Sequence, residues 1–575
     1  MKQKTDKIIF FFFLLFFIFL TILYYVEPFD DAFISYRVAH NLQEGRGFLF
    51  NPQGEKVEGF SNFLWVIILA FFSFLNLNIV NSSLILGIWL SLGTIFLSYQ
   101  LAKKIFPKYA LFVPFFIGTT DFFVRNSANG LETSLFTFLF ILSCSLFLKA
   151  LSPSSYSDFY LLLTSLSTFL LSLTRPEGPL IFFVITLFLI KEEAKNLPQG
   201  FKKIIIFVLP FFIFYIAYFS WRHTYFGYIL PNTYYARHLI LFANFADQLL
   251  KGGSYLFNFF KSQVHFFIIL IFSLFLFNKN VEREFKLLNL LLFTYIIFIL
   301  FSGGDWHHMT KMYRFMMPLV PLISLIALKI VLFHFKKKFV HLIPLALLFL
   351  LTLPQIKFDL YVPSQAHLTL SKKSTLFSCL TNKIKYPQNI KHQIVNFLTN
   401  KGSAHLDAKV GLWLKKYCDP NSLLASQQAG RLAFFSKTKF LDIDGLVNKT
   451  IAHMTRDDFR SKKYLDYIFN LSPNYFVFPV TKLKTASLYN PYLKKYNYTL
   501  TKIFCDKNSL PIFKTVYKNL YANRSYQFPN NLSIYFLCLF EKRKKEKRTL
   551  NKKNSLNLIF EDSWYSIEEK DLILF

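Results

Sequence analysis

Two adjacent carboxylates, Asp30 and Asp31, stand just after the first apolar run of the chain. An alcohol needs a base to take its proton as it attacks a carbon centre, and a carboxyl group beside a like charge has a raised pKa that suits this task. Neighbours in sequence need not point the same way, and acids at the end of an apolar run can also be merely hydrated at a membrane surface. The pair is therefore a candidate catalytic site that also has a structural explanation.

Four further polar groups interrupt apolar sequence farther along the chain. Charged residues close to hydrocarbon are costly, so each group is a functional candidate. The groups are residues 129–133 with Glu132, residues 174–178 with Arg175 and Glu177, residues 231–237 with Asn232 and Tyr235, and residues 303–308 with Asp305, His307 and His308.

Local structure offers a second explanation for each group. Glu132 would suit a helix start through the helix dipole, and Glu177 would suit a first helical turn. Arg175 needs an anion, which either Glu177 or a phosphate could supply. Three metal-ligand side chains within four loop residues rarely all reach one ion, so we predict no metal ligands, and a divalent cation stays an option. Lys311 and Arg314 add positive charge that could meet a phosphate or a lipid head group.

The loop after Asp31 is long and polar for a connection between membrane elements. Two turn signals, at residues 45–47 and 51–55, precede a run from Val57 into an apolar stretch, and Ser61 or Asn62 could cap the helix that begins there. A long polar loop held at both ends by membrane elements suits the wall of a cavity.

The composition places these groups in a membrane protein. Hydrophobic residues make up 53% and charged residues 17%, Phe occurs 75 times, and the mean hydropathy is +0.36. Disordered, collagen-like and disulfide-scaffold classes are excluded. The formal net charge of +32 fits basic cytoplasmic loops, and no zinc-finger spacing or RNP-like run supports a nucleic-acid partner.

Apolar runs and basic loops predict about eleven transmembrane helices. The first, near residues 8–26, lacks a cleavage site and is therefore read as an uncleaved span. Lys2, Lys4 and Lys7 precede it, which places the N-terminus inside. The stretch 60–75 is read as a juxtamembrane helix, because counting it as a span would move the following lysine-rich loops outside. The other spans are expected near 84–101, 109–122, 132–150, 159–174, 177–191, 204–221, 263–278, 287–302, 315–333 and 339–353.

This topology divides the chain into two domains. Residues 1–353 form the transmembrane domain, with a first outer loop at 27–83, and residues 354–575 form an extracytoplasmic domain. Extended apolar runs at 422–425, 440–443 and 475–478 alternate there with helix-like stretches near 404–417 and 450–469, which predicts a mixed α/β fold. The cysteines of this part, Cys379, Cys418, Cys505 and Cys538, could form two disulfides or stay free thiols.

Several strings resemble the GT-C superfamily of membrane glycosyltransferases. They occur in order over about residues 1–330: Asp30-Asp31-Ala32-Phe33-Ile34-Ser35-Tyr36-Arg37, Gly45-Arg46-Gly47, Glu58-Gly59-Phe60-Ser61-Asn62, and the strings at 130–133, 174–178, 231–236 and 303–306. Within the superfamily the strings are most similar to the group of the mycobacterial terminal arabinofuranosyltransferase. Farther on, Gln428-Ala429-Gly430 and residues 442–446 resemble the group loosely.

The resemblance implies an enzyme of the cytoplasmic membrane that takes a sugar from a polyprenyl-phosphate donor. The acceptor hydroxyl would belong to a cell-envelope glycan or glycolipid outside the cytoplasm, and the sugar carbon would be inverted. The family's catalytic base maps to Asp30 or Asp31. We expect Arg175, His307, Lys311 and Arg314 to bind the donor phosphate, and further substrate contacts from Arg37, Glu58, Asn62, Glu132, Glu177, Asn232, Tyr235 and Asp305.

Two other classes of protein fit parts of the pattern. A transporter or flippase of lipid-linked sugars would line its path with acids and arginine, but it should place polar groups at mid-membrane and on both sides. A membrane scaffold without chemistry would leave the outer polar groups unexplained. The polar groups collect on one side, which favours the glycosyltransferase.

Overall fold

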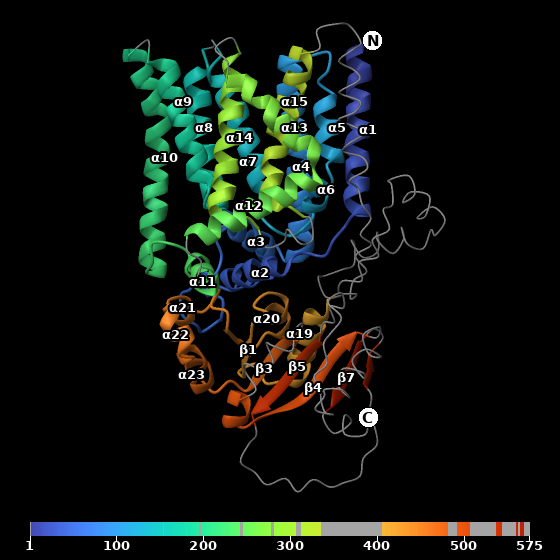
Figure 1. Ribbon diagram of the computed structural model, residues 1–575, viewed down its shortest axis with the longest axis vertical. Coiled ribbons are helices and arrows are strands. Elements are labelled where there is room, and N and C mark those ends of the chain that lie inside the picture. The colour runs from blue at the N-terminus through green and yellow to red at the C-terminus, as the bar shows by residue number, and fades with distance from the viewer. Residues whose placement is uncertain are drawn as a thin grey trace, which may run out of the picture.

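A computed structural model describes most of the chain. The described residues are 2–152, 155–194, 197–241, 245–277, 281–305, 312–334, 405–480, 491–506, 536–542, 559–561 and 564–568. Figure 1 shows a bundle of long helices with a smaller part, built of strands and short helices, at one of its ends. We call this smaller part, residues 405–568 as far as they are described, the C-terminal region.

Seven helices among the described residues are long and apolar enough to cross a membrane. They are α1 (Lys2–Leu23), α4 (Ile79–Ile105), α7 (Thr133–Ala150), α8 (Ser157–Thr174), α10 (Leu197–Phe226), α14 (Arg283–Ser302), and the 3₁₀ helix η3 (Arg314–Leu319) continued by α15 (Val320–His334). An eighth span is available if the bent pair α12 (Phe245–Ser262) and α13 (Val264–Ser273) crosses as one unit, although the pair turns by 107°.

The remaining expected spans form helices too short to pass as membrane spans or fall outside the described residues. The stretch 109–122 forms two helices, α5 (Phe112–Thr119) and α6 (Asp121–Asn126), because the chain turns out of helical geometry at Thr120. The stretch 177–191 forms α9 (Gly178–Glu193), which has 16 residues, and the stretch 339–353 lies outside the described residues. Helix α3 (Phe63–Phe74) has 12 residues, whereas a helical span needs about 20.

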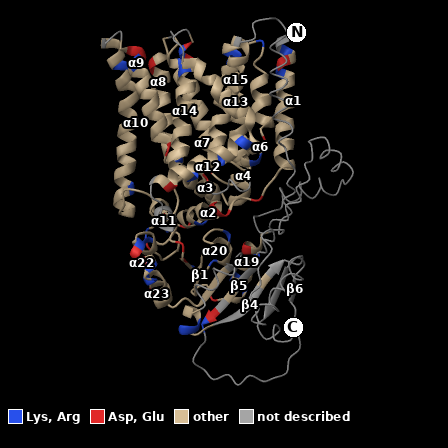
Figure 2. Cartoon of the chain, viewed as in Figure 1, with Lys and Arg blue, Asp and Glu red and all other residues tan. Residues whose placement is uncertain are grey.

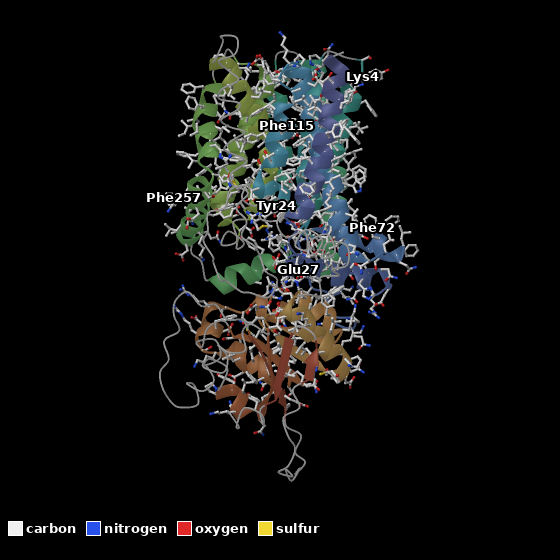
Figure 3. The ribbon with its side chains drawn as sticks, turned by 90° about the vertical axis from the view of Figure 1, so that its right-hand side faces the viewer. Lys4, Tyr24, Glu27, Phe72, Phe115 and Phe257 are labelled. Atoms are coloured by element: carbon white, nitrogen blue, oxygen red, sulfur yellow. The ribbon has the colours of Figure 1, made fainter. Side chains whose placement is uncertain are left out.

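The two ends of the bundle differ in what they carry. The N-terminus of α1 lies at the end away from the C-terminal region, and α2 (Asp30–Gln43), α3 and α11 (Asn232–Leu241) lie at the near end (Figure 1). In the view turned by 90°, Lys4 lies at the far end, Phe115 about halfway, and Glu27 beside the C-terminal region (Figure 3). Charged residues gather mainly at the two ends of the helices (Figure 2). This is the distribution that a bilayer imposes.

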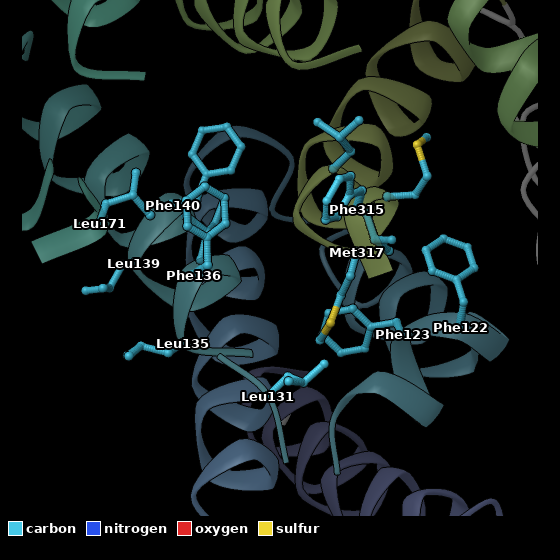
Figure 4. Packing of buried hydrophobic residues seen from close by; sticks show 14 of the residues in the cluster. Phe122, Phe123, Leu131, Leu135, Phe136, Leu139, Phe140, Leu171, Phe315 and Met317 are labelled. Carbon is cyan, nitrogen blue, oxygen red and sulfur yellow. The ribbon is translucent and has the colours of Figure 1, made fainter. Parts of the chain in front are cut away.

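The core of the bundle is packed with aromatic rings. Phe136 and Phe140 project from α7 and lie across from Phe315 and Met317 of η3 (Figure 4). The ring of Tyr295 from α14 lies 6.1 Å from Phe136 and 6.0 Å from Phe140, centre to centre. Close packing of this kind holds the helix ends at fixed positions relative to one another.

The C-terminal region has the mixed α/β fold that the sequence predicts. Its sheet has the strand order β2-β1-β3-β5-β4-β7-β6, with β2, β1 and β3 parallel and the remaining pairs antiparallel. The strands are β1 (Leu423–Ser426), β2 (Lys439–Asp442), β3 (Tyr475–Val480), β4 (Tyr498–Asp506), β5 (Phe536–Lys542), β6 (Ile559–Glu561) and β7 (Trp564–Glu568). The helices are α19 (Leu406–Tyr417), α20 (Arg431–Ser436), α21 (Lys449–Ala452), α22 (Arg456–Arg460) and α23 (Lys463–Asn470).

The state of Cys418 excludes two disulfides among the cysteines of the C-terminal third. Cys418 is a free thiol, so the four cysteines of the C-terminal third cannot make two pairs. Cys144 is also free and is buried inside the bundle, and Cys379 lies outside the described residues.

Candidate functional site

The polar groups of the sequence meet at the ends of helices that face the C-terminal region. Helix α7 begins at Thr133, α8 ends at Thr174, α9 begins at Gly178 and α14 ends at Ser302. The intervening loops carry Glu132, Arg175, Glu177 and Asp305. Ion pairs join Arg175 to Glu132 and Glu177, and join Arg314 to Asp305 and Asp31. We call the six residues Asp31, Glu132, Arg175, Glu177, Asp305 and Arg314 the charged cluster.

One half of the charged cluster is organised around Arg175. Its Nε donates to Oε1 of Glu177 at 2.6 Å, and its Nη1 lies 3.5 Å from Oε1 of Glu132. The hydroxyl of Tyr295 donates to the same Glu177 oxygen at 3.0 Å, and the amide of Asn62 donates to Glu132 at 3.0 Å. The anion that Arg175 requires is therefore supplied by two carboxylates of the protein.

Aromatic rings complete the surroundings of Arg175. The centre of its guanidinium lies 4.5 Å from the ring centroid of Phe315 and 5.5 Å from that of Phe136. A cation over a ring face is stabilised by the ring quadrupole, and the planar guanidinium also stacks well. Arg175 is thus held by two carboxylates and two aromatic rings.

The other half of the charged cluster is organised around Arg314. Its Nε lies 2.9 Å from Oδ2 of Asp305, and its Nη2 lies 3.9 Å from Oδ2 of Asp31. The side chain of Asp305 is fully buried, whereas that of Asp31 is 51% exposed. Asp31 is therefore the carboxylate of the cluster that a substrate can reach.

A glycine turn brings Asp305 to this position. Gly303 and Gly304 follow α14 with φ values of +79° and +74°, a left-handed conformation that only glycine adopts at little cost. A Cβ on Gly304 would also come within 2.6 Å of the ring of Tyr255. The left-handed backbone conformation therefore explains the two glycines of the Gly-Gly-Asp string.

Asp30 and Asp31 point to different partners. The carboxylate of Asp30 accepts from the backbone N–H of Gly430 at 3.2 Å and of Arg431 at 2.8 Å, in the C-terminal region. The guanidinium of Arg431 lies 3.8 Å away. Burial raises the pKa of Asp30, and the nearby Arg431 opposes that increase.

Three of the expected substrate contacts lie outside the charged cluster and have protein partners. Both carboxylate oxygens of Glu58 accept from Arg222, at 2.8 and 2.5 Å. Asn232 donates through its side-chain amide to Gly445 and Leu446 in the C-terminal region, at 2.8 and 2.9 Å. Arg37 donates to the main-chain oxygen of Phe50 in the first outer loop and to that of Thr438 in the C-terminal region.

The last expected contacts are divided between a stacked ring and undescribed residues. The ring of Tyr235 lies 4.3 Å from that of His453 in the C-terminal region. His307 and Lys311 lie outside the described residues. Over the parts of the chain that the structure covers, no group of three or more His, Cys, Asp or Glu side chains could hold a metal ion.

Three polar residues of these networks were not among the expected site residues. Tyr295 lies within an apolar span and gives no signal beyond its hydroxyl group, whereas Arg222 stands at the end of such a span, where a lone arginine is itself a signal. Arg431 directly follows the Gln428-Ala429-Gly430 string. Outside these networks, Asp442 of the 442–446 string is buried at the end of β2 beside Asp444, and burial with repulsion from Asp444 raises its pKa to about 7.

Comparisons with known proteins address the fold. The oligosaccharyltransferase AglB from Archaeoglobus fulgidus, solved with an inhibitory peptide and a dolichol-phosphate, superposes with a TM-score of 0.50 and 11% sequence identity. The match covers 87% of this chain and 73% of that one. The chain has a GT-C fold.

Other comparisons add less. ArnT from Cupriavidus metallidurans, bound to undecaprenyl phosphate, gives a TM-score of 0.49 at 10% identity over 93% of this chain and 98% of that one. Residues 388–528 match the model of a family described as a domain of unknown function, DUF8728. No curated protein matches the chain. The predicted GT-C fold is confirmed, and the likeness to the arabinofuranosyltransferase group stays a prediction.

Proposed function

We propose that the protein is a membrane glycosyltransferase that transfers a sugar from a polyprenyl-phosphate donor to an acceptor hydroxyl. The acceptor class we propose is a cell-envelope glycan or glycolipid. The observation that carries the proposal is the exposed carboxylate of Asp31 beside Arg314 and Asp305, at the helix ends of a GT-C fold. The structure of AglB with a dolichol-phosphate supports the donor class.

Asp31 is the proposed base because its neighbour is already engaged. Asp30 accepts two backbone N–H groups, lies beside Arg431 and is 29% exposed, whereas the side chain of Asp31 is 51% exposed. Asp31 would take the proton of the acceptor hydroxyl as its oxygen attacks the anomeric carbon. The bond from that carbon to the donor phosphate breaks at the same time, the phosphate leaves with the electron pair, and the carbon is inverted.

The leaving phosphate needs positive charge, and the charged cluster has little to spare. Its four carboxylates outnumber its two guanidinium groups, and Arg175 is already paired with Glu132 and Glu177. Arg314 is therefore the described residue best placed to meet the phosphate. One of its two carboxylate partners is Asp31, the proposed base, which loses its negative charge when it takes the proton. Lys311 and His307, which follow Asp305 in sequence, are proposed as the additional donors.

The C-terminal region is proposed to hold the acceptor. The parallel strands β1 and β2 end at Ser426 and Asp442, and ligands of parallel sheets bind outside such carboxyl ends. Gln427 and Asp444 follow these strands, and the amide of Gln427 donates to Asp444 at 3.0 Å. Amide and carboxylate groups are suited to the hydroxyl groups of a glycan.

The proposal is tested with the purified full chain in lipid vesicles that contain a polyprenyl-phosphate sugar. Asp31→Asn is expected to lower the rate of sugar transfer by about 10² to 10⁴-fold, the usual contribution of a general base. Glu44→Gln, an exposed acid at the other end of α2, is the matched control and should leave the rate unchanged. Full activity of Asp31→Asn would refute the base assignment. Donor movement across the bilayer without transfer would favour a flippase.

A further inference from the structure

The start of the C-terminal region's helix α20 is held by Asp30. The first N–H groups of a helix have no carbonyl partner within the helix. At α20 two of them, from Gly430 and Arg431, donate to the two oxygens of Asp30 at 3.2 and 2.8 Å. Gly430 permits this approach, because a Cβ there would collide with the carboxyl group of Asp30.

The other end of α20 is held by Arg37. The guanidinium of Arg37 donates to the main-chain oxygen of Ala433 within α20, and to that of Thr438 just beyond it at 2.8 Å. Its Nε donates to Phe50 of the first outer loop at 2.8 Å. Arg37 is 6% exposed, so these bonds are made away from water.

The lengths of the two helices match this arrangement. Asp30 and Arg37 are seven residues apart on α2, which places them on one face at a separation of about 10.5 Å. Helix α20 has six residues and is about 9 Å long. One face of α2 therefore reaches both ends of α20.

Aromatic packing fills the space between the two polar contacts. The ring of Phe33 on α2 lies 5.5 Å from that of Phe434 and 5.6 Å from that of Phe435 on α20. Arg431 also returns to the outer loop, where it donates to the main-chain oxygen of Pro28 and lies 5.2 Å from the ring of Phe33. The contact between α2 and α20 is thus fixed by polar groups at both ends and by rings in the middle.

We infer that Asp30 and Arg37 are positioning residues, by which α20 of the C-terminal region sets the placement of α2 and hence of Asp31. The inference rests on the proposed function. Asp31 adjoins Asp30 in sequence and points to Arg314 instead of α20. Releasing α20 lets the first turn of α2 shift, and a displacement of about 1 Å at a reacting group can cost on the order of 10²-fold in rate.

The test uses the full chain in vesicles and the variants Asp30→Asn, Arg37→Gln, their double variant and Asp31→Asn. Amide hydrogen exchange of a peptide covering Gly430 to Ser436 is expected to become faster in the Asp30 and Arg37 variants and to stay unchanged in Asp31→Asn. Unchanged exchange in Asp30→Asn would overturn the inference, whatever the activity measurements show.

Activity separates positioning from catalysis. Asp30→Asn and Arg37→Gln are each expected to lower kcat about 10-fold with an unchanged donor KM. The double variant should lose no more than the worse single variant, because both residues hold one contact. The acidic limb of the pH–rate profile should persist in Asp30→Asn and vanish in Asp31→Asn. Loss of that limb in Asp30→Asn would make Asp30 the base and overturn the inference.

The proposed function can fail separately from this inference. If Asp31→Asn keeps full transfer activity while hydrogen exchange of α20 still responds to Asp30→Asn, the base assignment is wrong. The contact between α2 and α20 would then stand as a docking device only.

Discussion

Glu58 and Arg222 form an ion pair whose side chains are 5% and 6% exposed. The pair joins the first outer loop to the end of α10, and Arg222 also donates to the main-chain oxygen of Ile229 at 2.6 Å. The main-chain oxygen of Glu58 accepts from Asn232, at the start of α11. Burial raises the pKa of Glu58 and its bonds to Arg222 lower it. A single residue pair thus ties three segments together.

We predict that Arg222→Met destabilises the folded protein by about 3 to 5 kcal/mol, because it leaves the carboxylate of Glu58 buried without its partner. The measurement is the denaturation midpoint of the full chain in detergent. Arg46→Met, which breaks the more exposed pair of Arg46 with Glu44, is the control and should cost at most about 1 kcal/mol. Equal losses in the two variants would contradict this assignment.

The sequence identifies the candidate residues of the site but does not tell which role or partner each of them has. The carboxylates of Asp30 and Asp31 could be named from their position after the first apolar run, yet their different directions are set by Gly430 and Arg431, about 400 residues away in the chain. Arg175 was known to need an anion, and only the structure shows that Glu177 and Glu132 provide it. Pairing across such distances leaves no trace in local spacing.

At the scale of elements, α3 has two different faces. Trp65 and Leu69 on one face are completely buried, whereas Phe71 and Phe74 are 59% and 69% exposed. A 12-residue helix with such an apolar outer face, beside the ends of membrane helices, is suited to lie in the interfacial layer of the bilayer. Its location next to α2 would then fix the depth of Asp31 relative to the lipid head groups.

We predict that a photoreactive benzoylphenylalanine at Phe74 captures phospholipid on illumination of the protein in vesicles. The same residue at Leu412, an exposed apolar position on α19 of the C-terminal region, is the matched control and should capture none. Radiolabelled lipid on the protein band is the readout. Equal labelling at both positions, or none at Phe74, would show that α3 is not at the membrane surface.

Apolar patterning predicted most elements because burial in lipid and burial in a core both follow hydrophobic content. Helices α4, α7, α8 and α14 and strands β1, β2 and β3 lie close to their expected positions. The break between α5 and α6 was missed: one span was expected over 109–122, although Asp121 directly follows Thr120 and three of the six residues of α6 are polar. The contact of α20 with α2 was also missed. Asp30 and Arg37 bond there to main-chain N–H and C=O groups, which almost every residue type can offer and which therefore leave no pattern in the sequence.

At the scale of the whole molecule, the charged cluster and the C-terminal region share one end of the bundle. Helix α4 ends with Lys103 and Lys104 in its last turn, and α1 begins with Lys2, at the opposite end. Lysine-rich loops are retained on the cytoplasmic side of membrane proteins. The arrangement therefore predicts that the proposed active site opens outside the cytoplasm, where a glycan acceptor is available.

This orientation is tested with single cysteines in a variant whose five native cysteines are replaced. A cysteine at Lys415 on α19 should react with a membrane-impermeant maleimide in intact spheroplasts, because the C-terminal region is expected outside. A cysteine at Lys108, in the loop after α4, is the matched control and should react only after the membrane is permeabilised. The opposite pattern would place the charged cluster in the cytoplasm, where a donor would have to be used before it crosses the membrane, and it would exclude the proposed envelope acceptor.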